Sequence, residues 1–229
     1  MELILPTDIR EKTHFNTGVQ FVVGCDEVGR GCLAGPVVAG AVFFDWSKPE
    51  IIEELARRVR ITDSKILTDI QKAESDRAIR EVASGIGIGV VRVETIDERN
   101  ILQASLLAMR KAVAQALEGM PEDVRPFVFV DGNQRIPYAR FDQETVIGGD
   151  GKVFSIAAAS IVAKVYRDNL MTKLHSRFPA YRWDENKGYG TPEHRAAIAA
   201  HGITPFHRKS FAGLGERGPA FAKASAGQP

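Results

Sequence analysis

The chain has 229 residues, of which 44% are hydrophobic and 26% are charged, with a formal net charge of +1. These values suit one large or two small globular domains and exclude a disordered chain, a collagen and a disulfide scaffold. The longest uncharged run, residues 31–44, is too short and too rich in glycine and proline for a membrane span. Residues 1–17 lack the apolar stretch of a secretory signal, and the only cysteines are Cys25 and Cys32. We therefore expect a reduced, cytoplasmic protein.

The charges are distributed unevenly along the chain. Residues 164–217 contain ten Lys or Arg and five Asp or Glu, a net charge of +5, whereas residues 1–163 carry −5. A basic C-terminal quarter suits a polyanionic partner, and an acidic body suits a cation-binding site. Two ordinary solvated surfaces explain the same numbers, so charge alone leaves both interpretations open.

No repeat, low-complexity tract or linker divides the chain. We interpret it as an N-terminal extension over residues 1–19, one domain over residues 20–212 and a tail over residues 213–229. The tail is rich in glycine and alanine, and we expect it to be loosely ordered.

Apolar runs, helical periodicity and turn residues predict an α/β fold with a mixed sheet and helices packed against it. The fully apolar run over residues 127–130 is typical of a central strand. In chain order we expect strands over 21–25 and 37–44, helices over 49–60 and from Thr68 or Asp69, a strand over 86–93, a helix over 97–117, strands over 127–130 and 145–147, and helices over 154–177 and 192–200.

Carboxylates stand at the ends of two predicted strands, as Asp26-Glu27 and as Asp131. Neighbouring strands lie about 4.8 Å apart, so Asp26 and Asp131 can share a cation if their two strands are adjacent. Glu27 points to the opposite face, and we expect it to join only if the strand breaks there. Such a cluster favours Mg²⁺ or Mn²⁺, and two such ions support phosphodiester hydrolysis. The alternative is that both positions are simple turns.

A further acidic candidate lies in the predicted helix over residues 154–177. Ser160, Lys164 and Asp168 are spaced by four residues and share one face of that helix. An ordinary surface Lys–Asp pair explains this spacing equally well. The alanines at 157–159, however, predict close packing of the same helix, which is consistent with a helix that borders a cleft.

Seven short sequence blocks, in this order, resemble type 2 ribonuclease H, the ribonuclease HII family. The resemblance spans about residues 20–212. The blocks are Gly24-Cys-Asp-Glu-Val-Gly-Arg-Gly31, Leu33-Ala-Gly-Pro-Val-Val38, Asp63-Ser-Lys65, Val130-Asp-Gly-Asn133, Ala159-Ser-Ile-Val-Ala-Lys-Val-Tyr-Arg-Asp168, Asn186-Lys-Gly-Tyr-Gly-Thr191 and His207-Arg-Lys-Ser-Phe211.

The resemblance implies a ribonuclease H-like fold, with a mixed five-stranded sheet flanked by helices and a helical C-terminal extension. It assigns catalysis and the binding of Mg²⁺ or Mn²⁺ to four acidic residues, Asp26, Glu27, Asp131 and Asp168. It assigns substrate binding to Gly29, Arg30 and Gly31 at the ribose 2′-OH, to Tyr189 on the sugar, and to Lys65 and Lys164 at backbone phosphates.

The implied activity is that of an endoribonuclease that hydrolyses RNA in RNA–DNA hybrids. It would cut 5′ to ribonucleotides embedded in duplex DNA and leave 3′-OH and 5′-phosphate ends, by two-metal-ion catalysis. The implied partners are RNA–DNA hybrids and ribonucleotide-containing DNA, with no membrane, and we expect a monomer. Ribonucleotide excision repair and primer removal both fit this activity.

The sequence departs from the family pattern at Val28 and Cys32, where Ala and Pro are common. We expect these departures to alter rate or preference and to leave activity intact, because neither residue is a ligand. Asp168 in place of Glu, and the lack of a large N-terminal domain, argue against the related type 3 enzyme. Three alternatives remain: an enzyme that cuts only long hybrids, a hybrid-binding protein without catalysis, and a small-molecule phosphatase.

Overall fold

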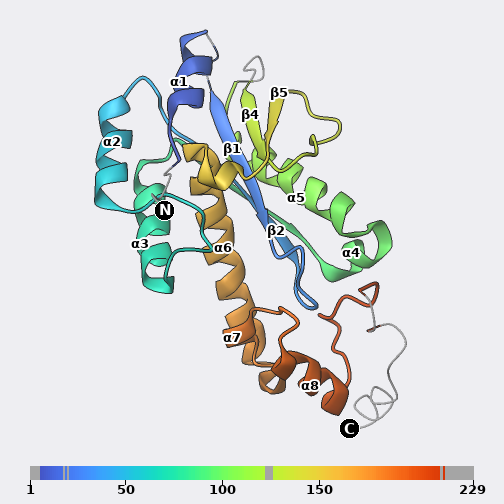
Figure 1. Ribbon diagram of the computed structural model, residues 1–229. Coiled ribbons are helices and arrows are strands. Elements are labelled where there is room, and N and C mark those ends of the chain that lie inside the picture. The colour runs from blue at the N-terminus through green and yellow to red at the C-terminus, as the bar shows by residue number, and fades with distance from the viewer. Residues whose placement is uncertain (1–5, 18, 20, 122–125, 212–213, 215–229) are drawn as a thin grey trace. The chain divides into compact units, whose positions relative to one another are not determined.

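A computed structural model of the protein describes residues 6–17, 19, 21–121, 126–211 and 214 (Figure 1). These residues form two compact units. Of the described residues, those within Met1–Val28, Val38–Val90 and Ser105–Val165 form the sheet unit, and those within Gly29–Val37, Val91–Ala104 and Tyr166–Pro229 form the C-terminal unit. The boundaries expected at residues 19 and 212 stay predictions. The tail, apart from Leu214, lies outside the described residues.

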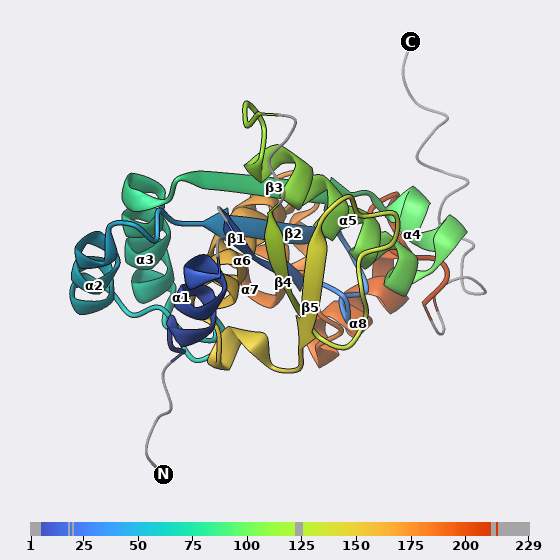
Figure 2. The same cartoon turned by 90° about the horizontal axis from the view of Figure 1, so that it is seen from above.

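The sheet unit is built on a mixed five-stranded sheet, as predicted. The strand order is β3-β2-β1-β4-β5, which can be followed from above in Figure 2. Strand β1 pairs antiparallel with β2 and parallel with β4, and β4 pairs parallel with β5. The strands are β1 (Val22–Val28), β2 (Val37–Phe43), β3 (Gly85–Val91), β4 (Phe127–Asp131) and β5 (Asp142–Val146).

Helices cover the sheet and also occur throughout the C-terminal unit. Two of the predicted helix starts are confirmed by side-chain caps, since Thr68 forms a capping box with Gln71 and Thr191 accepts from the His194 N–H. No helix within the described part of the chain has the length and apolar character needed to cross a membrane. The helices are α1 (Ile9–Asn16), α2 (Pro49–Arg58), α3 (Asp69–Val82), α4 (Val93–Arg99), α5 (Ile101–Ala116), α6 (Phe154–His175), α7 (Trp183–Asn186) and α8 (Pro192–His201).

Helices α5 and α6 lie on opposite faces of the sheet. On the α6 face, a Cβ added to Gly40 of β2 would lie 2.4 Å from the carbonyl oxygen of Ala159, so the helix backbone touches the sheet here. On the other face, the Cys25 Sγ lies 4.0 Å from the carbonyl oxygen of Met109 in α5. The close packing predicted from the alanines at the start of α6 is confirmed, since all of them are fully buried.

Helix α1 was not predicted from the sequence, and it supports the start of α6. The fully buried Glu11 carboxylate accepts hydrogen bonds from both the N–H and the hydroxyl of Ser155, each at 2.8 Å. A carboxylate at this position satisfies an amide of the first helical turn and complements the helix dipole. Burial raises the pKa of Glu11 above its ordinary value, and the Ser155 hydrogen bonds partly offset that rise.

Several predicted boundaries shift in the structure. The helix predicted over 97–117 is wrong as a single element, because α4 and α5 are separated by Asn100, whose φ of +67° breaks the helix. The Asn100 side chain then accepts the Gln103 N–H at 3.1 Å and starts α5. The strand predicted to end at residue 93 ends at Val91, and the one predicted over 145–147 begins earlier, at Asp142.

Candidate active site

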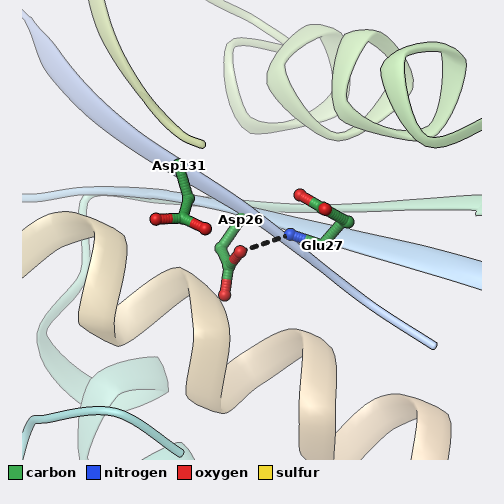
Figure 3. A group of neighbouring side chains, drawn as sticks. All are labelled: Asp26, Glu27 and Asp131. Carbon is green, nitrogen blue, oxygen red and sulfur yellow. Dashed lines mark hydrogen bonds between the residues drawn. The ribbon is translucent and has the colours of Figure 1, made fainter. Parts of the chain in front are cut away.

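The predicted meeting of two carboxylates at the ends of neighbouring strands is confirmed. Strands β1 and β4 pair in parallel as far as Cys25 and Val130, and the next residues are Asp26 and Asp131. One carboxylate oxygen from each of Asp26, Glu27 and Asp131 lies within 4.8 Å of the others (Figure 3). We call these three residues the acidic centre.

Glu27 joins the acidic centre by a different route from the one expected. Strand β1 does not break after Asp26, since its pairing with β2 continues as far as Val28 opposite Val38. Asp26 points toward α6 and Glu27 points to the other side of the strand (Figure 3). Because β4 ends at Asp131, side chains from both faces of β1 reach the space beyond that end. The expectation that Glu27 requires a strand break is therefore wrong.

Asp26 is 5% exposed and sits in a strongly unfavourable environment for charge. Burial, followed by the charges of Glu27 and Asp131, raises the pKa of Asp26 well above its ordinary value, while a hydrogen bond from Ser160 of α6 lowers it. Asp26 also accepts the N–H of Glu27 at 2.7 Å. The carboxylate is thus fixed in position by the chain but is electrostatically uncompensated by it.

Asp131 is oriented by the turn that precedes α6. The Gly149 N–H donates to Asp131 Oδ1 at 2.6 Å. Burial raises the pKa of Asp131, the Gly149 hydrogen bond opposes the rise, and the nearby charges of Asp150 and Lys65 act in opposite directions. Lys65 Nζ donates to Asp150 at 3.0 Å and lies 3.4 Å from Asp63, although its side chain is 75% exposed.

Asp150 is a carboxylate that the sequence analysis missed. It is 8% exposed, and its charge raises the pKa of both Asp26 and Asp131. Its sequence context, Gly148-Gly149-Asp150-Gly151, is an ordinary turn composition. The available signal was its likeness to Asp131-Gly132, an aspartate beside glycine, although Asp131 ends its strand and Asp150 stands four residues after β5.

The predicted substrate loop, residues 29–36, belongs to the C-terminal unit and is held by two fully buried arginines. Arg208 donates to the carbonyl oxygens of Gly29 at 2.7 Å, Arg30 at 2.8 Å and Gly35 at 2.9 and 3.0 Å. Arg167 donates to those of Ala34, Pro36 and Lys187 at 2.8–3.1 Å. The two arginines thus bond five carbonyl oxygens of the loop and one, that of Lys187, outside it, and sequence reasoning assigned neither arginine a role.

Tyr189, also predicted, is 42% exposed and lies beside the same loop. The carbonyl oxygen of Gly188 accepts the N–H groups of Leu33 at 2.8 Å and Ala34 at 3.3 Å, which joins the two segments. Burial and the neighbouring Cys32 thiol raise the pKa of Tyr189, with a smaller contribution from Asp168. Cys32, one of the two departures from the family pattern, is therefore in contact with a predicted substrate-binding residue.

The remaining predicted residues are divided between the two units. Lys164 and Asp168 both lie on α6, Lys164 in the sheet unit and Asp168 in the C-terminal unit. The group of three carboxylates that the structure brings together does not include Asp168. Its predicted role as a metal ligand stays a prediction.

Three carboxylates have oxygens within 4.8 Å of one another, and two of them have raised pKa values. This arrangement suits a hard divalent cation, whose positive charge would compensate them. The donor set contains only oxygen, which suits Mg²⁺ or Mn²⁺ and not the softer metals. Within the C-terminal unit, a loop bonded by two buried arginines and an exposed aromatic ring are features that suit a sugar-phosphate chain.

Comparisons with known proteins agree with this chemistry. The family model of ribonuclease HII matches residues 23–214. A ribonuclease HII of Bacteroides thetaiotaomicron is 48% identical over 194 residues, which cover 84% of this chain and 90% of that protein. One from Chlorobium luteolum is 45% identical over 210 residues, with 91% and 96% covered.

The fold comparison points the same way. The crystal structure of the ribonuclease H2 from Pyrococcus horikoshii OT3 aligns with a TM-score of 0.64 and 25% identity, covering 84% of this chain and 94% of that one. The match therefore extends over both units of the chain. The chain belongs to the ribonuclease HII family and is a metal-dependent ribonuclease H, an endonuclease that acts on RNA–DNA hybrids.

Proposed function

We propose that the enzyme cuts on the 5′ side of ribonucleotides embedded in duplex DNA and leaves 3′-OH and 5′-phosphate ends. The observation that carries this proposal is the acidic centre, in which three carboxylates converge beyond the end of β4. Such a cluster suits phosphodiester hydrolysis. The substrate loop follows Glu27 by two residues in the chain, so one stretch of sequence supplies both cleavage and recognition.

We infer that the acidic centre holds two Mg²⁺ or Mn²⁺ ions, as the family resemblance implies. When bound, such ions ready a water for attack and stabilise the departing 3′ oxygen. Asp26, Glu27 and Asp131 supply carboxylate oxygens for them. Ser160 and the Gly149 N–H hold two of these carboxylates in place, so the ligands are ordered before any cation arrives.

Two residues compete for the role of a fourth carboxylate. Asp168 is the residue that the family resemblance indicated. Asp150 competes because its charge raises the pKa of both Asp26 and Asp131, but it too lies outside the group of three carboxylates and is paired with Lys65 at 3.0 Å. We propose Asp168 as the fourth carboxylate, with Asp150 as the competing candidate.

Recognition of the ribonucleotide is assigned to Gly29, Arg30, Gly31 and Tyr189. Gly31 is exposed, and a Cβ added to it would meet no atom within 4 Å. The fold therefore leaves open space at Gly31, into which a ribose 2′-OH can approach the backbone. The half-exposed ring of Tyr189 offers a flat surface for the sugar. Lys65 and Lys164 are assigned to backbone phosphates, with salt-dependent binding as a consequence.

The test uses an end-labelled DNA duplex with one ribonucleotide, incubated in Mg²⁺, in Mn²⁺ and in EDTA, beside an all-DNA duplex and a continuous RNA–DNA hybrid. The expected result is a metal-dependent cut 5′ to the ribonucleotide and none in the all-DNA control. Cutting of the continuous hybrid alone would contradict the proposed specificity.

Paired substitutions locate the fourth carboxylate. Asp168→Asn is expected to abolish metal-dependent cleavage, and Asp150→Asn is expected to leave more activity, because the Asp150 carboxylate is already paired with Lys65 at 3.0 Å. The reverse order would give the role to Asp150. Hydrolysis of simple phosphomonoesters by the wild type at comparable rates would favour the phosphatase alternative.

A further inference from the structure

Two histidines with no role in hydrolysis lie side by side in the C-terminal unit. His194 of α8 and His207 are both 0% exposed, and their Nε2 atoms are 3.1 Å apart. Burying polar groups costs free energy unless each one finds a hydrogen-bond partner. The partners of this pair therefore indicate what it does.

The neighbours fix the tautomers of both rings. The Thr204 N–H donates to His207 Nδ1 at 2.9 Å, so His207 carries its proton on Nε2 and donates to His194 Nε2. His194 Nε2 also accepts from the Trp183 indole at 3.0 Å, which leaves its proton on Nδ1. That proton is donated to the carbonyl oxygen of Tyr189 at 2.8 Å. The chain of hydrogen bonds thus ends on the backbone of Tyr189.

Both rings are neutral near pH 7, which this arrangement requires. Burial, and then the neighbouring His194, lower the pKa of His207 to about 4. Burial also lowers the pKa of His194. The rings of Tyr181 and Trp183 stand 5.0 and 5.4 Å from that of His207 and exclude water from the pair.

The segment that carries His207 also holds the substrate loop. The next residue is Arg208, whose side chain donates to the carbonyl oxygens of Gly29 and Arg30. The Arg208 N–H donates to the Leu33 carbonyl oxygen at 2.9 Å. The segment His207-Arg208 is therefore linked to two predicted substrate-binding elements. Arg208 bonds to the loop assigned to the 2′-OH, and His207 is linked through His194 to Tyr189.

We propose that His194 and His207 are positioning residues that hold Tyr189 in register with the substrate loop, and that this register sets the preference for an embedded ribonucleotide over continuous RNA. The inference rests on the proposed function of Tyr189. A single ribonucleotide offers only one 2′-OH, so its recognition depends on loop and ring acting together. Continuous RNA offers a 2′-OH at every position and tolerates a displaced ring.

The test compares kcat/KM for a duplex with one ribonucleotide with kcat/KM for a continuous RNA–DNA hybrid. His194→Leu removes the bond to the Tyr189 carbonyl and is expected to lower the ratio about tenfold, the scale of one orphaned buried acceptor. His194→Asn places its side-chain amide donor where the Nδ1–H of His194 stands and is expected to restore most of the ratio. His201→Leu, on the same helix but exposed, is the matched control and is expected to change nothing.

A double-mutant cycle with Tyr189→Ala separates positioning from plain structural support. If the pair acts through the Tyr189 ring, His194→Leu lowers the ratio no further once the ring is gone. A further loss in that background, or an equal loss on both substrates in the single variant, would overturn the inference. His194→Gln, whose amide reaches the position of Nε2 and not that of Nδ1, serves in the same way if the leucine variant does not fold.

The wild-type enzyme is the control for the proposed function itself. Wild type that fails to cut at a single ribonucleotide would overturn both the proposed function and the role of the pair. Wild type that cuts there, with variants that keep the full ratio, would overturn only the role of the pair.

Discussion

The acidic centre and the substrate loop differ in how the protein compensates their charged and polar groups. In the sheet unit, Asp26, Glu27 and Asp131 bring negative charge together, and the raised pKa values of Asp26 and Asp131 show that the chain does not neutralise it. In the C-terminal unit, the buried guanidinium groups of Arg167 and Arg208 bond to backbone carbonyl oxygens of the loop.

The difference indicates that the acidic centre needs a bound cation to compensate its charge, whereas the protein itself supplies the partners of the substrate loop. The acidic centre is held in a conformation that is costly until a cation binds, so it favours activity at the expense of stability. The substrate loop already has its hydrogen-bond partners and is fixed before substrate arrives. Substitutions in the two regions are therefore expected to separate activity from stability.

The largest effect on activity is expected from Asp131→Asn. Losing one electrostatic stabiliser of a transition state commonly costs about 10²–10³-fold in rate, and loss of a metal ligand is expected to cost at least that much. Stability in EDTA is expected to stay equal or to rise, since one of three repelling carboxylates is gone. Cleavage assays and thermal melting with and without Mn²⁺ measure both effects.

The metal dependence of melting supplies the control for that experiment. Wild type is expected to gain stability with Mn²⁺, because an ion that binds only the folded state shifts the equilibrium toward it. Asp142→Asn, an exposed carboxylate at the start of β5, is expected to keep both the gain and the activity. Full metal stabilisation in Asp131→Asn would contradict its assignment as a ligand.

Arg208→Met is expected to show the opposite pattern, with stability lost first. The substitution leaves the carbonyl oxygens of Gly29, Arg30 and Gly35 without their donor in a buried site, which costs on the order of 3–5 kcal/mol. Denaturant unfolding measures this loss. Arg182→Met, at an exposed arginine of the same unit, is the control. Similar losses in the two variants would show that the hydrogen bonds from Arg208 to the loop do not contribute specifically to stability.

Much of the acidic centre could be predicted because strand ends and carboxylates are local signals. Asp26 and Asp131 each follow an apolar run, and the parallel pairing of β1 with β4 then brings them together. Glu27 was misjudged because its position depends on β1 continuing along β2 after β4 has ended. The relative lengths of two neighbouring strands are a tertiary property that no single strand's sequence reveals.

The supporting residues were hidden for a related reason. Arg167 and Arg208 look like surface residues in a basic C-terminal quarter, yet both are fully buried. Apart from the carbonyl oxygen of Lys187, their acceptors lie more than 130 residues away in the chain, and a backbone carbonyl has no sequence signature. Asp150 was missed because a glycine-flanked aspartate is what any turn contains.

The buried histidines predict how the C-terminal unit responds to acid. The pKa of His207 is about 4 in the folded protein and about 6.5 when unfolded, so the unfolded chain binds more protons between these values. The contribution of His207 to the free energy of unfolding is therefore fully present above about pH 6.5. It is lost as the pH drops toward 4, by roughly 3 kcal/mol. The unfolding free energy of wild type minus that of His207→Gln, measured from pH 7 to 4, isolates the contribution. A flat difference would contradict it.

The smallest and most selective test compares two glycines of one loop. Gly29 has a φ of +89°, and a Cβ there would lie 2.2 Å from Arg167 Nε, whereas a Cβ at Gly31 meets nothing within 4 Å. Gly29→Ala is thus expected to lower stability by about 1–3 kcal/mol, because the fold itself requires glycine there. Gly31→Ala is expected to leave the melting temperature unchanged and to reduce cleavage at a single ribonucleotide, since the added methyl group occupies only the space left for substrate. Equal melting losses in both variants, or full cleavage by Gly31→Ala, would show that the open space at Gly31 has no part in recognition.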